Sequence, residues 1–117
     1  MDDDIIRIYH NKRCSKSRGA CQVIAAAGLS AEVIDYLNDT PSRDELIDIL
    51  ALLGMRPAEI VRRGEAVFKE HYAERILSDE EWLDALLAHP ILIERPIVVR
   101  GGKAVIGRPP EKVLELL

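Results

Sequence analysis

The sequence has few aromatic residues, few cysteines and no long hydrophobic segment. Only 4% of its 117 residues are aromatic although 48% are hydrophobic, so the core of a single domain of this length must be mainly aliphatic. No apolar run approaches the ~20 residues of a transmembrane helix. The opening Met-Asp-Asp-Asp lacks the basic start of a secretory signal. We therefore expect a cytoplasmic protein that does not enter a membrane.

Acidic residues outnumber basic residues overall, 20 to 16. The formal net charge is -4, which argues against nucleic acid or an anionic membrane surface as a partner. No cluster of side chains has the spacing of metal ligands, so we expect no metal and no bound organic cofactor. The chain has two cysteines, Cys14 and Cys21. In a reducing compartment, catalysis or packing explains them better than a structural disulfide.

One short segment around Cys14 is strongly basic. Residues 10–18 read His-Asn-Lys-Arg-Cys-Ser-Lys-Ser-Arg, with four cations and no carboxylate, so subtracting +4 from -4 leaves the other residues at -8. This segment follows an apolar run over 5–9 that predicts a strand, and it leads into a predicted helix. A helix N-terminus beside cations favours a thiolate and a bound oxyanion. The combination favours a functional Cys14 over a chance surface cysteine.

The first 37 residues predict a strand, a helix and a second strand. Ser15 or Ser17 caps the helix, which runs to about Ala27 and ends at Gly28. Helical spacing places four residues on its inner face: Cys21, Ile24, Ala25 and Gly28. Residues 32–37 then predict a strand parallel to the first, as in a βαβ unit.

Residues 38 to about 90 read as a helical insertion within one domain that spans residues 1–117. Ser42 with Glu45, and Ser78 with Glu81, have the spacing of capping boxes and predict two helix starts. The first of these helices ends at Gly54 and the second at His89. A short helix is expected after Pro57.

The last residues predict two strands and a helix. Gly101-Gly102 separates β-branched runs at 97–99 and 104–106, which indicates a hairpin. Pro109-Pro110 opens a final helix, whose expected inward residues are Val113, Leu114 and Leu117. The resulting order, βαβ, helices, ββα, predicts an α/β fold with a thioredoxin-like mixed sheet and a helical insertion between its halves.

Three blocks of sequence resemble the glutaredoxin-coupled arsenate reductase family. Residues 9–18 share Tyr-His-Asn, a cysteine four residues after the histidine, and Ser-Arg three and four residues beyond that cysteine. Residues 89–99 (His-Pro-Ile-Leu-Ile-Glu-Arg-Pro-Ile-Val-Val) and 107–109 (Gly-Arg-Pro) also match. Ser15-Lys16 stands where the best-known arsenate reductases have Gly-Thr, and Lys12 stands where the family often has Pro. A subgroup of related proteins carries Cys-Ser-Lys-Ser-Arg, as this chain does.

The resemblance implies a role for the matched residues. Cys14 is the nucleophile, and Arg95 and Arg108 hold the oxyanion together with a third arginine, for which Arg62 aligns better than Arg63. Arginine suits this role because its planar guanidinium pairs with two oxygens at once. Arg18 adds a further cation beside the cysteine.

Three other matched residues lie in the same blocks. The resemblance implies that His10 favours the thiolate, although an exposed loop histidine is an equally good interpretation. Ser17 either donates a hydrogen bond to the thiolate or caps the helix. Pro96 resembles the cis-proline of thioredoxin-like folds, and an ordinary strand-edge proline is the alternative.

The implied reaction has arsenate or a related oxyanion as substrate, glutathione as co-substrate and glutaredoxin as partner. The Cys14 thiolate attacks arsenate and water leaves. Glutathione attacks the arsenic, arsenite departs, and glutaredoxin clears the Cys14–glutathione disulfide. We expect Cys21 in the core, because seven residues of helix rise about 10.5 Å whereas a disulfide needs Cα atoms within about 7 Å.

Other functions stay open. One is a glutathione-linked thiol oxidoreductase that acts on glutathionylated substrates. Another is a redox-sensing regulator that binds RNA polymerase, but such relatives usually carry Cys-x-x-Cys and this chain has Ser17 at the second position. A low-molecular-weight phosphatase is disfavoured, because its Cys-x5-Arg loop requires arginine where this chain has Ala20.

Overall fold

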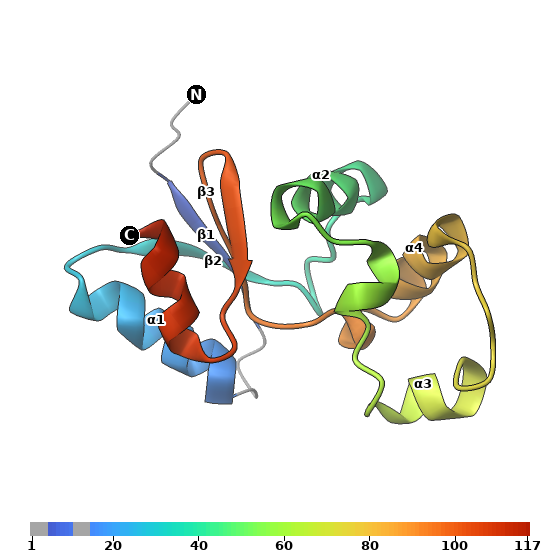
Figure 1. The fold of residues 1–117 in the computed structure, drawn as a ribbon. Coiled ribbons are helices and arrows are strands. Elements are labelled where there is room, and N and C mark those ends of the chain that lie inside the picture. The colour runs from blue at the N-terminus through green and yellow to red at the C-terminus, as the bar shows by residue number, and fades with distance from the viewer. Residues whose placement is uncertain (1–4, 11–14) are drawn as a thin grey trace. The chain divides into compact units, whose positions relative to one another are not determined.

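The computed structural model describes residues 5–10 and 15–117 (Figure 1). The chain divides into two compact units: unit 1 comprises Met1–Asp39 and Arg95–Leu117, and unit 2 comprises Thr40–Glu94. Unit 2 contains the helical block expected over about 38–90; the expectation of one domain over the whole chain stays a prediction. Within the described ranges no helix has the length and apolar character to cross a membrane.

In the described part of unit 1, four strands form one mixed sheet of order β2-β1-β3-β4. The strands are β1 (Ile6–His10), β2 (Ala31–Asp35), β3 (Ile97–Arg100) and β4 (Lys103–Ile106). β1 is parallel to β2 and antiparallel to β3, which pairs with β4 through the Gly101-Gly102 turn. The predicted βαβ unit and hairpin are therefore confirmed.

Two helices cover the same face of this sheet, α1 (Ser15–Ala26) and the 3-10 helix η3 (Pro110–Leu116) (Figure 1). The buried core on this face consists of Ile6, Ile8, Ala20, Ile24, Val98, Val113 and Leu116, with Cys21 partly buried against it. Ala25 and Gly28 were expected inside but are exposed, because the inner stripe of α1 runs through Ser17, Ala20 and Ile24 and the helix ends at Ala26.

The inward face of η3 also differs from the expectation. Leu114 and Leu117 are 57% and 37% exposed, whereas Val113 and Leu116 are buried. A 3-10 helix has three residues per turn, so Val113 and Leu116 share one face. The prediction of Leu114 and Leu117 as inward residues is therefore wrong.

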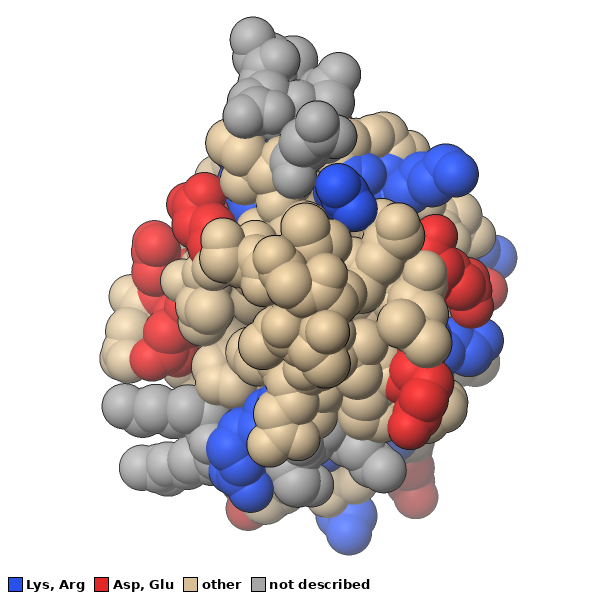
Figure 2. All heavy atoms as spheres, turned by 90° about the vertical axis from the view of Figure 1, so that its left-hand side faces the viewer, with Lys and Arg blue, Asp and Glu red and all other residues tan. Residues whose placement is uncertain are grey.

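The charges of α1 lie only in its first turns. Residues 19–31 contain no charged side chain, and Figure 2 shows a broad uncharged area on the side of unit 1 that carries α1. The cations that follow Cys14 are thus concentrated where the helix begins.

Unit 2 is helical. Its elements are α2 (Arg43–Leu53), η1 (Pro57–Ile60), α3 (Ala66–His71), α4 (Asp79–Ala88) and η2 (Pro90–Leu92). Ser42 and Ser78 cap α2 and α4 as expected, Gly54 ends α2 in the left-handed conformation and His89 ends α4. The sequence did not predict α3 and η2, which are too short to show a helical period. Phe68 of α3 stacks on Trp82 of α4, with ring centroids 6.2 Å apart.

Gly107 allows close packing between the segment after β4, α1 and Pro96. A Cβ atom at Gly107 would lie 2.9 Å from Pro96 Cγ and 3.2 Å from Val113 Cγ2. We expect Gly107→Ala to lower the free energy of unfolding by about 1–3 kcal/mol, measured by denaturant titration. Gly102→Ala is the control, because a Cβ there meets nothing within 4 Å. Equal stability of the two variants would show that the close contact is not required.

Candidate functional site

The residues of unit 1 that resemble the arsenate reductase family lie at one edge of the sheet, where β1 and β4 end and β3 begins. Tyr9 pairs with Ile97, and Ile97 pairs with Ile106. His10, Pro96 and Gly107 each lie one residue beyond this row. The edge therefore brings together three segments that are far apart in the sequence.

Arg95 and Arg108 flank this edge. The Gly107 N–H donates to the Pro96 carbonyl oxygen at 2.9 Å, and Nη1 of Arg108 donates to the Arg95 carbonyl oxygen at 3.2 Å. The Arg95–Pro96 peptide bond is cis, as the resemblance implied, and Arg108–Pro109 is cis as well. The structure thus places both arginines at the same edge, and their role in holding an oxyanion stays a prediction.

Helix α1 begins at Ser15, directly after Cys14. Cys14 lies outside the described residues, so its role as nucleophile stays a prediction. The first turn of α1 contains no acidic residue, which leaves the positive end of the helix dipole unopposed by a carboxylate of that turn. Ser17 is the third residue of α1, so the alternative that it caps the helix is wrong. Its side chain is fully buried on the inner face, and Arg18 is exposed.

His10 ends β1 and faces charges of opposite sign. Burial lowers its pKa below the ordinary value; the Asp35 carboxylate raises it and the Arg18 guanidinium lowers it further. His10 Nδ1 is a buried atom with no hydrogen-bond partner among the described residues. These conditions favour a neutral imidazole near pH 7.

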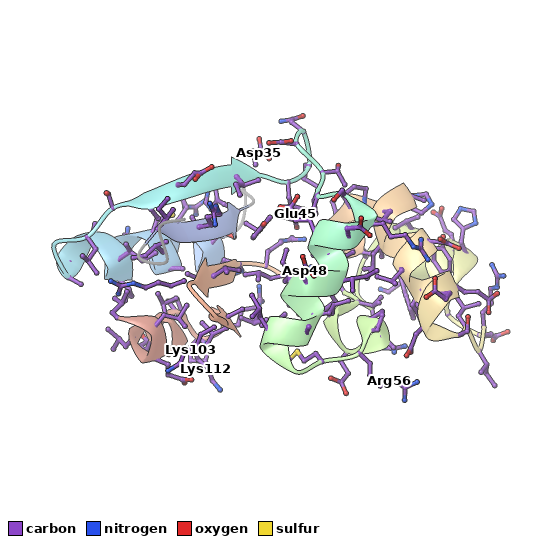
Figure 3. The ribbon with its side chains drawn as sticks, turned by 90° about the horizontal axis from the view of Figure 1, so that it is seen from above. Asp35, Glu45, Asp48, Arg56, Lys103 and Lys112 are labelled. Carbon is purple, nitrogen blue, oxygen red and sulfur yellow. The ribbon has the colours of Figure 1, made fainter. Side chains whose placement is uncertain are left out.

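Asp35 is a residue that the sequence analysis missed. It pairs with His10 across the parallel strands and lies where β2 ends (Figure 3). Its Oδ2 accepts a hydrogen bond from Asn38 Nδ2 at 2.8 Å. The signal was present in the sequence, because the carboxyl ends of parallel strands lie at the same edge of a sheet.

Arg62 lies in unit 2 between two carboxylates. Its Nε donates to Glu65 Oε2 at 3.2 Å and its Nη1 donates to Glu94 Oε1 at 2.8 Å. Burial lowers the pKa of Arg62, but the hydrogen bonds and charges of the two carboxylates outweigh burial and leave the pKa raised. Arg62 is therefore a fixed cation, and its role as the third oxyanion ligand stays a prediction.

Arg63 has different surroundings. Its guanidinium carbon lies 5.2 Å from the Phe68 ring centroid and 5.9 Å from that of Trp82. These are cation–π distances. The two neighbouring arginines are thus held by different kinds of group, carboxylates for Arg62 and aromatic rings for Arg63.

Cys21 is partly buried against the core of unit 1. Burial raises the pKa of its thiol, which disfavours the thiolate needed for attack. This environment supports the expected packing role.

The described residues contain no group of three or more His, Cys, Asp and Glu side chains arranged to hold a metal ion. His71 and His89 stack on each other in unit 2, with ring centroids 6.4 Å apart. The expectation that the protein uses no metal stays a prediction.

Known proteins resemble this chain along nearly its whole length. The model of the ArsC family matches residues 9–116. The chain is 46% identical over 114 residues to the uncharacterized protein YfgD of Escherichia coli K12, a match covering 96% of each. It is 41% identical over 114 residues to an arsenate reductase of Neisseria meningitidis serogroup A, covering 96% of this chain and 97% of that protein. The arsenate reductase structure from Vibrio cholerae matches with a TM-score of 0.91 and 42% identity, over 97% and 98% of the two chains. These matches confirm the expected α/β fold class.

The electrostatic surroundings of His10 give a testable titration. We expect Asp35→Asn to lower the pKa of His10, because it removes the carboxylate that favours the imidazolium, and Arg18→Gln to raise it. NMR titration of the His10 ring measures both shifts, with the neighbouring Asp39→Asn as control.

The lowered pKa also predicts the direction of a stability change. The unfolded chain binds this proton more tightly than the folded protein, so the contribution of His10 reduces stability as pH falls through about 6.5. In the NMR titration described above, an unchanged His10 pKa in Asp35→Asn would contradict the proposed influence of the carboxylate.

Proposed function

Because this chain belongs to the ArsC family, we propose that it reduces arsenate to arsenite through Cys14, with glutathione and glutaredoxin as the source of electrons. One observation carries the proposal. Arg95 and Arg108 lie together at one edge of the sheet. Helix α1 begins beside this edge, and its first residue directly follows Cys14. The chain is also 41% identical to an arsenate reductase.

The proposed nucleophile is the Cys14 thiolate. The N–H groups of a first helical turn have no partner within the helix, and together with the cations of residues 12–18 they favour the anionic form of the sulfur. A neutral His10 accepts the thiol proton or orients the sulfur, and Ser17 donates a hydrogen bond to the sulfur.

The proposed oxyanion ligands are Arg95 and Arg108, with Arg62 as a third donor and Arg18 adding positive charge. A guanidinium fork offers two parallel hydrogen bonds to a tetrahedral oxyanion. The forks also steady the charge that develops on the oxygens when sulfur attacks arsenic. The same chemistry accepts arsenate or a related oxyanion.

The electrons come from two thiols. Attack by Cys14 forms a sulfur–arsenic bond and releases water. Attack by glutathione then releases arsenite and leaves a Cys14–glutathione disulfide, so the two sulfurs lose the two electrons that reduce As(V) to As(III). Glutaredoxin reduces this disulfide. We place the reaction in the cytoplasm, where thiols are kept reduced, and it requires no metal or bound cofactor.

The activity test is arsenite formation from arsenate with glutathione and glutaredoxin. We expect Cys14→Ser to abolish turnover because it removes the nucleophile, whereas Cys21→Ala, the matched control, retains most of it because Cys21 is a partly buried thiol with a raised pKa. Arsenite release can be followed by chromatography with arsenic detection. Wild-type rates in Cys14→Ser would exclude the proposed nucleophile.

The anion site has its own test. We expect Arg95→Lys and Arg108→Lys each to lower kcat/KM for arsenate at least about tenfold, or ~1.4 kcal/mol in the barrier, because an ammonium does not replace a bidentate fork. Arg7→Lys is the control, since Arg7 is an exposed residue of β1 paired only loosely with Glu32 at 3.6 Å. Full activity in both folded lysine variants would place the anion site elsewhere.

A further inference from the structure

The Arg62 guanidinium is bound on two of its three nitrogens by acidic residues of its own unit. Glu65 binds Nε and Glu94 binds Nη1. The three side chains are partly buried, at 21%, 22% and 26% exposure for Arg62, Glu65 and Glu94. Water therefore screens this cluster less than it screens a surface ion pair.

The backbone holds this arrangement in place. The Arg62 N–H donates to the Leu92 carbonyl oxygen at 2.7 Å, and the Glu94 N–H donates to the Ile60 carbonyl oxygen at 2.8 Å. Val61 and Ile93 form an antiparallel bridge between the same two segments. Glu94 is thus held beside Arg62 by main-chain bonds, and it directly precedes Arg95 in the chain.

The positions of the two carboxylates limit how Arg62 can bind an anion. A guanidinium presents paired donors along two edges, Nε with Nη2 and Nη1 with Nη2. Glu65 takes a nitrogen of the first edge, and Glu94 takes a nitrogen of the second. An oxyanion that forms two parallel hydrogen bonds with Arg62 must therefore use at least one nitrogen that already donates to a carboxylate.

The charges act in the same direction. One guanidinium and two carboxylates together have a net charge of -1, so the two carboxylates weaken the attraction of Arg62 for an oxyanion. Arg62 would attract an anion more strongly without its two acidic neighbours. The carboxylates therefore act as internal competitors for Arg62.

We propose that Glu94, aided by Glu65, determines the affinity of the protein for tetrahedral oxyanions by competing with them for Arg62. The proposal rests on the proposed function in taking Arg62 as an oxyanion ligand. Glu94 is then an affinity-setting residue, and the substrate gains two hydrogen bonds from Arg62 only by sharing a nitrogen with a carboxylate or by displacing that carboxylate.

The test measures binding of inorganic phosphate, a tetrahedral oxyanion that the protein does not reduce, by isothermal titration calorimetry. We expect Glu94→Gln to bind phosphate about fivefold more tightly or better, a change of about 1 kcal/mol, because the amide keeps the side-chain shape without its charge. Glu65→Gln should change affinity in the same direction and provides a second variant if Glu94→Gln does not fold.

A matched control exists in the same unit. Arg43 also lies between two carboxylates, Glu80 and Asp84, and has no proposed role in the site. Glu80→Gln should leave phosphate affinity unchanged. The gain in Glu94→Gln should also vanish in the Arg62→Lys background, because the competition acts through the Arg62 fork.

The outcomes separate this inference from the proposed function. Unchanged or weaker phosphate binding in folded Glu94→Gln and Glu65→Gln, or a gain that persists without Arg62, overturns the competition even if the wild type reduces arsenate. Tighter binding that depends on Arg62, in a protein that fails to reduce arsenate, supports the competition and contradicts the proposed function instead.

Discussion

The antiparallel pairing of β3 with both β1 and β4 is the constraint on which the rest of unit 1 depends. It aligns Tyr9, Ile97 and Ile106 in one row, so the residues just beyond them converge although nearly a hundred positions separate them in the chain. The close approach of Gly107 to Pro96 and α1 then fixes the segment that carries Arg108. Strand pairing and packing alone therefore bring Arg95, Arg108 and the start of α1 to one edge of the sheet, and no substrate is needed to bring them together.

Much of this fold could be predicted because its signals are local. Serine caps, a left-handed glycine and a Gly-Gly turn each act within a few residues. One error arose where the helical period itself changed. The last helix is a 3-10 helix with three residues per turn, so Leu116 is buried and Leu114 is exposed. Helix α3 has only six residues, and its contact between Phe68 and Trp82 has no counterpart in a local pattern.

The candidate site was predictable to a similar degree. The family motifs gave the positions of Arg95 and Arg108, and strand pairing accounts for their meeting. The contact of Glu94 with Arg62 could not be predicted, because the two residues lie 32 positions apart in the sequence and only backbone pairing brings them close. The position of Asp35 beside His10 could have been predicted, because the two residues are paired in neighbouring parallel strands.

The central claim is that Cys14 forms a mixed disulfide with a thiol from another molecule as As(V) is reduced to As(III), while Cys21 stays in the core. It is tested most directly by a reaction of wild-type protein with arsenate and glutathione in the absence of glutaredoxin, followed by alkylation and peptide mass spectrometry. The account predicts one glutathionyl group on Cys14 and an alkylated, unoxidised Cys21. A Cys14–Cys21 disulfide formed together with arsenite, or arsenite without modification of Cys14, would contradict it.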